Sequence, residues 1–200
     1  FPQKTEEKKL KDVIGQLPSL KTMGEISSND FYHGFRKYSK HMIDWIADLK
    51  EGQSAFDNKD PKKRPHRIID DKIIHNQKKN GDKYSRCYWN KVAPCVHTRN
   101  DIFASQATIH PKDNRVFSIR ELMLMMTIPS DFRWVEQDLN SLNKLSFEEK
   151  SKILSKEEIN IRQSIGEAVP TEIFRKIAQN IKKNFNSDLN KIKINKIIEK

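Results

Sequence analysis

The chain has 200 residues, of which 36% are hydrophobic and 32% are charged, so it has enough apolar side chains to bury a core. Lys and Arg outnumber Asp and Glu by 38 to 27, and the net charge of +11 favours a polyanionic partner, either nucleic acid or an anionic membrane surface. No apolar run approaches the roughly 18 residues of a membrane span, and two cysteines are too few for a disulfide framework or a four-cysteine zinc site.

The first fifty residues predict two helices. Residues 1–30 are polar except for an apolar stretch, Val13-Ile14 and Leu17-Pro18, which indicates a short helix ending in a turn. A second group of apolar residues recurs at steps of three and four, as on one face of a core-facing helix. These residues are Phe35, Tyr38, Met42, Trp45 and Leu49, and Gly52 lies where such a helix would end.

Residues 58–86 are the most basic part of the chain, with ten Lys or Arg against four Asp, a local net charge of +6. Pro61, Pro65 and the turn signal Asn80-Gly81 predict loops and short strands here. Three aromatic residues follow directly, namely Tyr84, Tyr88 and Trp89. Basic residues interleaved with aromatics are typical of a nucleic-acid surface, although a merely solvated charged face has a similar composition.

The next segments predict strands and then a buried helix. Residues 88–98 alternate weakly around Pro94, which indicates two short strands or an edge strand. Ser118 and Glu121 have the spacing of a capping box that opens a short helix from Ile119 to about Thr127. This helix is apolar almost all round, so we expect it to be buried.

The last third of the chain predicts helices. Ser146-Glu149 and Ser155-Glu158 are two further capping boxes, which indicate two short surface helices. Residues 162–170 suggest a tight glycine turn whose free amides would suit an anionic ligand or a polar cofactor edge. A long helix is expected after Pro170, with a loose helix or tail over residues 184–200.

No self-contained active site is visible among these residues. The six glycines are never one residue apart, which excludes a Gly-x-Gly phosphate loop, and the six histidines lack metal-ligand spacing. Cys95, after Pro94, is the one candidate nucleophile, but no neighbouring histidine or carboxylate would activate it. We therefore interpret it as a partly buried strand residue and predict neither a catalytic residue nor a metal site.

Three segments together resemble the carboxy-terminal part of the DNA cytosine-5 methyltransferases, in that family's order. Residues 12–18, D-V-I-G-Q-L-P, resemble its D-A-I-x-D-L-P motif. Residues 84–96, followed by Ile109-His110-Pro111, Arg115 and Arg120-Glu121, resemble its block ending in R-E and F-P-D. Residues 165–170, I-G-E-A-V-P, resemble its closing I-G-N-A-V-P motif.

The resemblance implies a two-lobed enzyme that flips a cytosine out of duplex DNA and methylates its carbon 5 with S-adenosylmethionine. The family's F-x-G-x-G cofactor loop and its Pro-Cys-Gln, Glu-Asn-Val and Q-x-R-x-R motifs do not occur in these 200 residues. Since the chain begins with Phe1, we expect either a segment excised from a longer protein or the smaller subunit of a split enzyme. Its partners would be double-stranded DNA and the catalytic domain or subunit, and it would be cytoplasmic, at the nucleoid, in a restriction-modification system.

The expected fold is mixed α/β, a small recognition lobe of short strands and loops with flanking helices that dock on a Rossmann-like methyltransferase domain. Residues 1–52 would form a helical connector, residues 53–135 the target-recognition region, and residues 136–200 a helical part that completes the methyltransferase domain. Two alternatives remain open. One is a non-catalytic basic DNA-binding or regulatory module, and the other is a basic RNA-binding protein.

The resemblance also suggests site residues. Gly166, Glu167 and Ala168 would border S-adenosylmethionine, with Glu167 in place of the family's asparagine. Candidate DNA contacts are Lys78, Lys79, Lys83, Arg86, Thr98, Arg99 and Arg115. Cys95 stands where the family usually has a threonine that binds the DNA backbone, and Thr98 or Arg99 would take over that role. Arg115 and Arg120 would mainly organise the recognition lobe.

Overall fold

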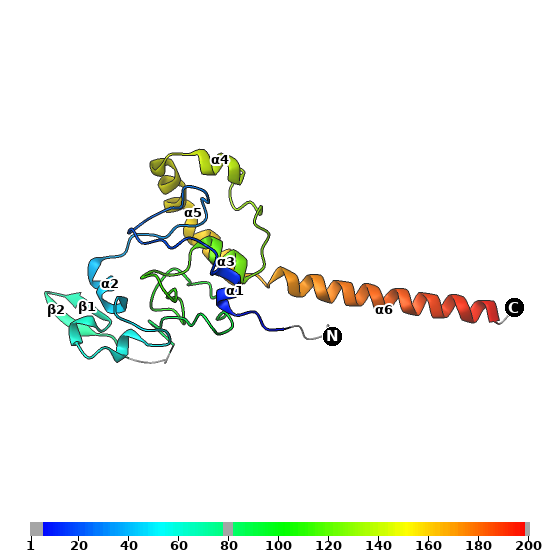
Figure 1. Cartoon of the computed structure of the whole chain (residues 1–200), viewed down its shortest axis with the longest axis horizontal. Helices are drawn as coiled ribbons and strands as arrows, with labels where there is room; N and C mark the ends of the chain where they lie inside the picture. The colour runs from blue at the N-terminus through cyan, green and yellow to red at the C-terminus, as the bar shows by residue number, and fades with distance from the viewer. Residues whose placement is uncertain (1–5, 78–81, 199–200) are drawn as a thin grey trace. The chain divides into compact units, whose positions relative to one another are not determined.

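The computed structural model describes residues 6–77 and 82–198, which combine helices with one small sheet, so the fold is mixed α/β as expected (Figure 1). The helices are α1 (Leu10–Ile14), α2 (Lys40–Ile46), α3 (Ile119–Met125), α4 (Leu139–Lys144), α5 (Phe147–Glu167) and α6 (Thr171–Ile198). The strands are β1 (His66–Ile69) and β2 (Lys72–His75), and two 3-10 turns precede them at Ala55–Asp57 and Pro61–Lys63.

The chain divides into two compact units. Lys8–Ala168 forms the larger unit, and α6 belongs to the other. Within the described residues, no helix is both long enough and apolar enough to cross a membrane.

The two helices expected in the first fifty residues are present, but the second is shorter than predicted. It begins only at Lys40, because Phe35 lies in an extended segment where its amide donates to the Glu25 carbonyl at 3.1 Å. Phe35, Trp45 and Leu49 are nevertheless buried. The apolar spacing therefore identified core residues correctly but overestimated the length of the helix.

β1 and β2 form an antiparallel hairpin, which confirms the short strands expected in the basic stretch. Ile68 faces Ile73 across the hairpin, and Asp70 and Asp71 form the turn with φ angles of 48° and 58°. Positive φ at both central residues is the requirement of a type I′ turn. The turn predicted at residues 80–81 lies outside the described residues.

The strands predicted over residues 88–98 are not formed, and this expectation was wrong. Val92 makes only an isolated bridge to Lys9. The carbonyls of Trp89 and Lys91 instead accept the first amides of α1, Lys11 N at 3.0 Å and Leu10 N at 2.8 Å. This stretch therefore stabilises a helix terminus and pairs with no strand.

α3 is the centre of the larger hydrophobic cluster. The predicted capping box is present, since the Ser118 hydroxyl accepts from the Glu121 amide at 3.1 Å and the Glu121 carboxylate accepts from the Ser118 amide at 2.7 Å. The helix packs against α1 and α5 (Figure 1). Its cluster contains the fully buried residues Leu10, Ile14, Phe31, Met123, Leu142 and Ile165. A second cluster lies beneath α2 and includes Trp45, Ile46, Tyr84, Phe103, Ile109 and Val116.

The C-terminal third is more continuous than the sequence predicted. Ser146 caps α5 through the expected box with Glu149, but Ser155 lies inside the same 21-residue helix, where its hydroxyl donates to the Lys152 carbonyl at 2.8 Å. Gly166 also lies within α5, so the predicted glycine turn is wrong. The long helix after Pro170 is confirmed as α6, and it continues to Ile198.

Candidate nucleic-acid interface

Residues 113–121 form a buried ion network. The Arg115 guanidinium donates to both carboxylate oxygens of Glu121, at 2.7 and 2.8 Å, and its Nε and Nη2 donate to Asp113 Oδ2 at 3.1 and 2.9 Å. The side chains of Arg115 and Glu121 are each 1% exposed. A cation so deeply buried is stable only because the two carboxylates surround it.

Titration behaviour within this network follows from the same contacts. Burial alone would raise the pKa of Glu121, but the charge and hydrogen bonds of Arg115 overcome burial and hold the pKa at about 2. Burial lowers the pKa of His110 to about 4, so His110 is neutral at pH 7. Its Nδ1 accepts the amides of Lys112 and Asp113, at 3.2 and 2.8 Å, which leaves the proton on Nε2, 3.5 Å from Glu121.

Arg86 also has a structural position. Its Nη1 donates to the carbonyls of His110 and Asp113, at 2.8 and 3.1 Å, and its Nη2 donates to the Ile46 carbonyl at 2.8 Å. The residue is 4% exposed and ties the end of α2 to the loop before α3. The position of Arg86 therefore does not support the expected phosphate contact, and the burial of Arg115 leads to the same correction.

A third buried arginine, Arg120, binds Asp30. Its Nε and Nη2 donate to that carboxylate at 2.5 and 3.1 Å, and its Nη1 donates to the Ser130 carbonyl at 3.0 Å. It thereby joins α3 to two loops. Its contacts are therefore structural within the described residues.

The remaining predicted DNA contacts differ in exposure. Thr98 and Arg99 are exposed, although Arg99 Nε donates to Asp101 at 3.0 Å, and Lys83 is half-buried. Lys78 and Lys79 lie outside the described residues.

The basic stretch predicted over residues 58–86 includes an exposed basic surface around the hairpin, whose members were not among the predicted DNA contacts. Its members are Lys59, Lys62, Arg64, Arg67 and Lys72, and we name it the hairpin surface. Lys63 is adjacent but forms an ion pair with Asp48. The signal was the segment R-I-I-D-D-K-I-I over residues 67–74, whose two aspartates take the turn conformation.

The predicted cofactor residues lie at the end of α5. A Cβ on Gly166 would lie 2.5 Å from the backbone of His97 and Thr98, so this glycine permits the helix to touch that loop. Glu167 and Ala168 are exposed, and the Gln163 amide donates to the Glu167 carboxylate at 2.8 Å. No sequence pattern indicated the nearby pair of Arg162 and Asn100, joined at 3.1 Å.

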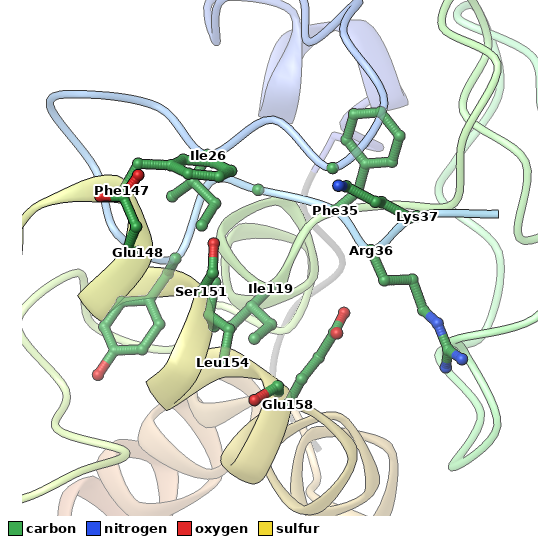
Figure 2. A pocket seen from close by; sticks show the side chains of 14 residues that line it. Ile26, Phe35, Arg36, Lys37, Ile119, Phe147, Glu148, Ser151, Leu154 and Glu158 are labelled. Carbon is green, nitrogen blue, oxygen red and sulfur yellow. The ribbon is translucent and has the colours of Figure 1, made fainter.

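An apolar pocket of about 410 Å³ lies between α5 and residues 24–37. Figure 2 shows Ile26 and Leu154 on its walls and Glu158 and Arg36 toward one side. Its lining suits a hydrophobic group better than a phosphate. Among the residues that the structure describes, no group of His, Cys, Asp and Glu is arranged to hold a metal ion.

The two cysteines differ in position. Cys87 is buried, which raises the pKa of its thiol to about 12, so it is not a thiolate at neutral pH. Cys95 is exposed, which corrects the expectation that it is partly buried.

Comparison with known proteins points to one family. The profile of the C-5 cytosine-specific DNA methylases matches residues 1–183. The Type II methyltransferase M1.HgaI of Avibacterium volantium is 28% identical over 198 residues, covering 90% of this chain and 46% of that protein. The Type II methylase M.HgiDII of Herpetosiphon aurantiacus is 29% identical over 103 residues, covering 52% of this chain and 25% of that protein. The chain thus spans about half the length of the first relative and a quarter of the second.

Proposed function

Since the chain belongs to the C-5 cytosine-specific DNA methylase family, we propose that it is the carboxy-terminal DNA-recognition part of a DNA cytosine-5 methyltransferase from a restriction-modification system. Such an enzyme turns a cytosine out of the duplex and transfers a methyl group to its carbon 5. The observation that carries the proposal is the family match over residues 1–183 in a chain of net charge +11. The catalytic cysteine belongs, in this proposal, to a catalytic part that pairs with these residues.

In this proposal, the recognition lobe spans residues 53–135, and its role is to bind the DNA duplex. The Arg115–Glu121 network and Arg86 support this role indirectly, because they fix long loops that have little regular structure. Direct phosphate contacts fall to the exposed Thr98 and Arg99 and the half-buried Lys83, together with Lys78 and Lys79 outside the described residues. Residues 1–52 and 136–200 provide the helical parts that meet the catalytic domain.

Gly166, Glu167 and Ala168 border S-adenosylmethionine in this proposal. Glu167 fits a cationic sulfonium, because its carboxylate is exposed and Gln163 is the one partner described for it. Gly166 contributes by position rather than by contact, since it lets the end of α5 lie against residues 97–98. These residues form one border of a cofactor site, so the catalytic part supplies the rest. When bound, the cofactor supplies the methyl group.

Reconstitution tests the proposal. The chain is mixed with the segment or subunit of the same organism that carries the cofactor loop and the Pro-Cys-Gln motif, and transfer of tritiated methyl from S-adenosylmethionine to duplex DNA is measured. We expect transfer from the mixture and none from the chain alone. Transfer by the chain alone that survives Cys95→Ser would contradict the assignment of the catalytic cysteine to another segment.

Binding without methyl transfer in the same mixture has a different meaning. It would favour a non-catalytic DNA-binding module over a methyltransferase part. Competition of labelled duplex DNA against RNA then shows which nucleic acid the chain prefers. The comparison is made at each concentration of a salt series, because phosphate contacts make both affinities depend on salt.

A further inference from the structure

The β1–β2 hairpin exposes four isoleucine side chains to solvent. All its residues are exposed except His66. Ile68 and Ile73, which pair across the strands, are 58% and 48% exposed, and Ile69 and Ile74 are 46% and 42% exposed. Burial of an exposed isoleucine lowers the free energy of the system, so this surface favours contact with a partner that removes it from water.

The hairpin is anchored at its open end, at His66 and Asn76, which we call the foot, and its turn at Asp70 and Asp71 is exposed. His66 packs edge-to-face on Trp45 with ring centroids 5.4 Å apart. Asn76 donates its amide to the Pro65 carbonyl at 2.8 Å and its side-chain NH₂ to the Tyr84 hydroxyl at 3.1 Å. The foot therefore presents residues 67–74 to solvent in a fixed orientation.

Charge and register indicate the chemistry of the partner. Cross-strand partners share a face, so Ile68 and Ile73 lie on one face, while Arg67 with Ile74 and Ile69 with Lys72 lie on the other. Other members of the hairpin surface, Lys59, Lys62 and Arg64, add positive charge near the foot. This combination suits a polyanion that also presents apolar groups.

We propose that the hairpin enters the major groove of duplex DNA, where Ile68 and Ile73 contact thymine methyl groups and Arg67 and Lys72 reach phosphates at the groove rims. The major groove admits a two-stranded ribbon, and the thymine methyl is the apolar group that base edges present there. This inference rests on the proposed function and assigns its sequence reading to a specific element. It follows that the recognised sequence contains thymine.

Removing the thymine methyl tests the contact directly. Duplexes are first enriched from a randomised pool by the 200-residue chain, then synthesised with thymine or with uracil, which differs only in lacking the methyl. Binding to both is measured by fluorescence anisotropy. We expect uracil to weaken binding by about fourfold for each methyl contacted, the effect of one buried carbon group. The double variant Ile68→Gln/Ile73→Gln should bind both duplexes equally.

Two further variants make the result specific. Ile68→Val/Ile73→Val keeps apolar, β-branched side chains and should retain the preference for thymine. Ile159→Ala removes an isoleucine that is 56% exposed on α5, away from the hairpin sequence, and should behave as wild type.

Each alternative outcome has a definite meaning. If wild type does not distinguish thymine from uracil, or if the Gln variant distinguishes them as well as wild type does, the hairpin does not read thymine methyls. The proposed function then still stands on the methyl-transfer assay. Failure of the wild-type chain to bind any duplex would overturn the hairpin proposal, and methyl transfer by the reconstituted mixture would then decide the proposed function by itself.

Discussion

Three arginines show how one residue type serves the interior of this protein. Arg86, Arg115 and Arg120 are each at most 5% exposed, and carboxylates or backbone carbonyls surround them. Guanidinium groups suit this use because they present several donors in a rigid plane. Arg86 and Arg120 join segments distant in sequence, as Arg120 does with Asp30, whereas Arg115 binds Asp113 and Glu121 within its own loop and the start of α3.

Breaking the central pair should destabilise the fold strongly. Glu121→Gln leaves the buried Arg115 charge only partly compensated, and we expect a loss of about 3–5 kcal/mol in the free energy of unfolding. Urea denaturation measures the change. Glu136→Gln, an exposed carboxylate in a loop, is the control and should shift stability by about 0.5 kcal/mol or less. A comparably small effect for Glu121→Gln would contradict a structural role.

His110 should make stability depend on pH. Its folded pKa of about 4 lies below the ordinary value of 6.5, so the unfolded chain takes up the proton first as pH falls. The free energy of unfolding should therefore fall by up to about 1.4 kcal/mol per pH unit as the pH drops from about 6.5 to about 4, the window between the two pKa values of His110. Denaturation between about pH 7 and pH 5 should show a slope that His110→Gln reduces. An unchanged slope would mean that His110 titrates normally.

At the scale of elements, local signals succeeded where they were self-contained. The Ser118 and Ser146 caps, the buried α3 and the helix after Pro170 depend on neighbours in sequence, and all were predicted. One local signal failed, since Ser155 of the predicted Ser155-Glu158 box lies inside α5. Two other failures depended on distant partners. Residues 88–98 form no strand because their carbonyls accept the first amides of α1. α5 continues through Gly166, where the backbone of residues 97–98 lies against the helix.

Gly166 provides a test of that contact. Gly166→Ala should raise helix propensity by about 1 kcal/mol but place a Cβ against the backbone of His97 and Thr98. Overpacking of this kind costs about 1–3 kcal/mol, so we expect a lower melting temperature. Ser164→Ala, exposed on the same helix, should leave the melting temperature unchanged or slightly raised. A stabilised Gly166→Ala would show that the loop yields easily.

The hairpin turn predicts a stabilising substitution. Asp71 has a φ of 58°, a conformation that glycine adopts without the steric cost of a Cβ. Asp71→Gly should therefore slow amide hydrogen exchange in β1 and β2, since Asp-Gly is a favoured type I′ pair. Asp60→Gly, before the second 3-10 turn, lacks this geometry and removes an N-cap, so it should give no such protection.

At the scale of the whole molecule, the sequence predicted the basic character but chose its residues imperfectly. The net charge of +11 and the segment over residues 58–86 correctly pointed to an exposed basic region. Arg86 and Arg115 were chosen as contacts because sequence does not distinguish an arginine that binds phosphate from one that fixes a loop. That distinction depends on tertiary burial.

The salt dependence of DNA binding should distinguish side chains that contact phosphate from arginines that fix a loop. Lys83→Gln/Arg99→Gln should reduce the slope of log affinity for duplex DNA against log salt by about 2, one for each phosphate contact removed. Arg86→Gln should lower the free energy of unfolding, and in the folded population it should keep the slope. Anisotropy titrations from about 50 to 200 mM salt measure the slopes. Equal slopes for wild type and the double variant would exclude Lys83 and Arg99 as phosphate contacts.

The foot of the hairpin has a consequence for how this protein can diversify. The described contacts that hold it involve His66 and Asn76, just outside residues 67–74. Neither hydrophobic cluster includes a side chain from residues 67–74. That octapeptide can therefore change in sequence while the scaffold stays the same, so that, if the hairpin reads DNA as we propose, a new target sequence requires no new fold.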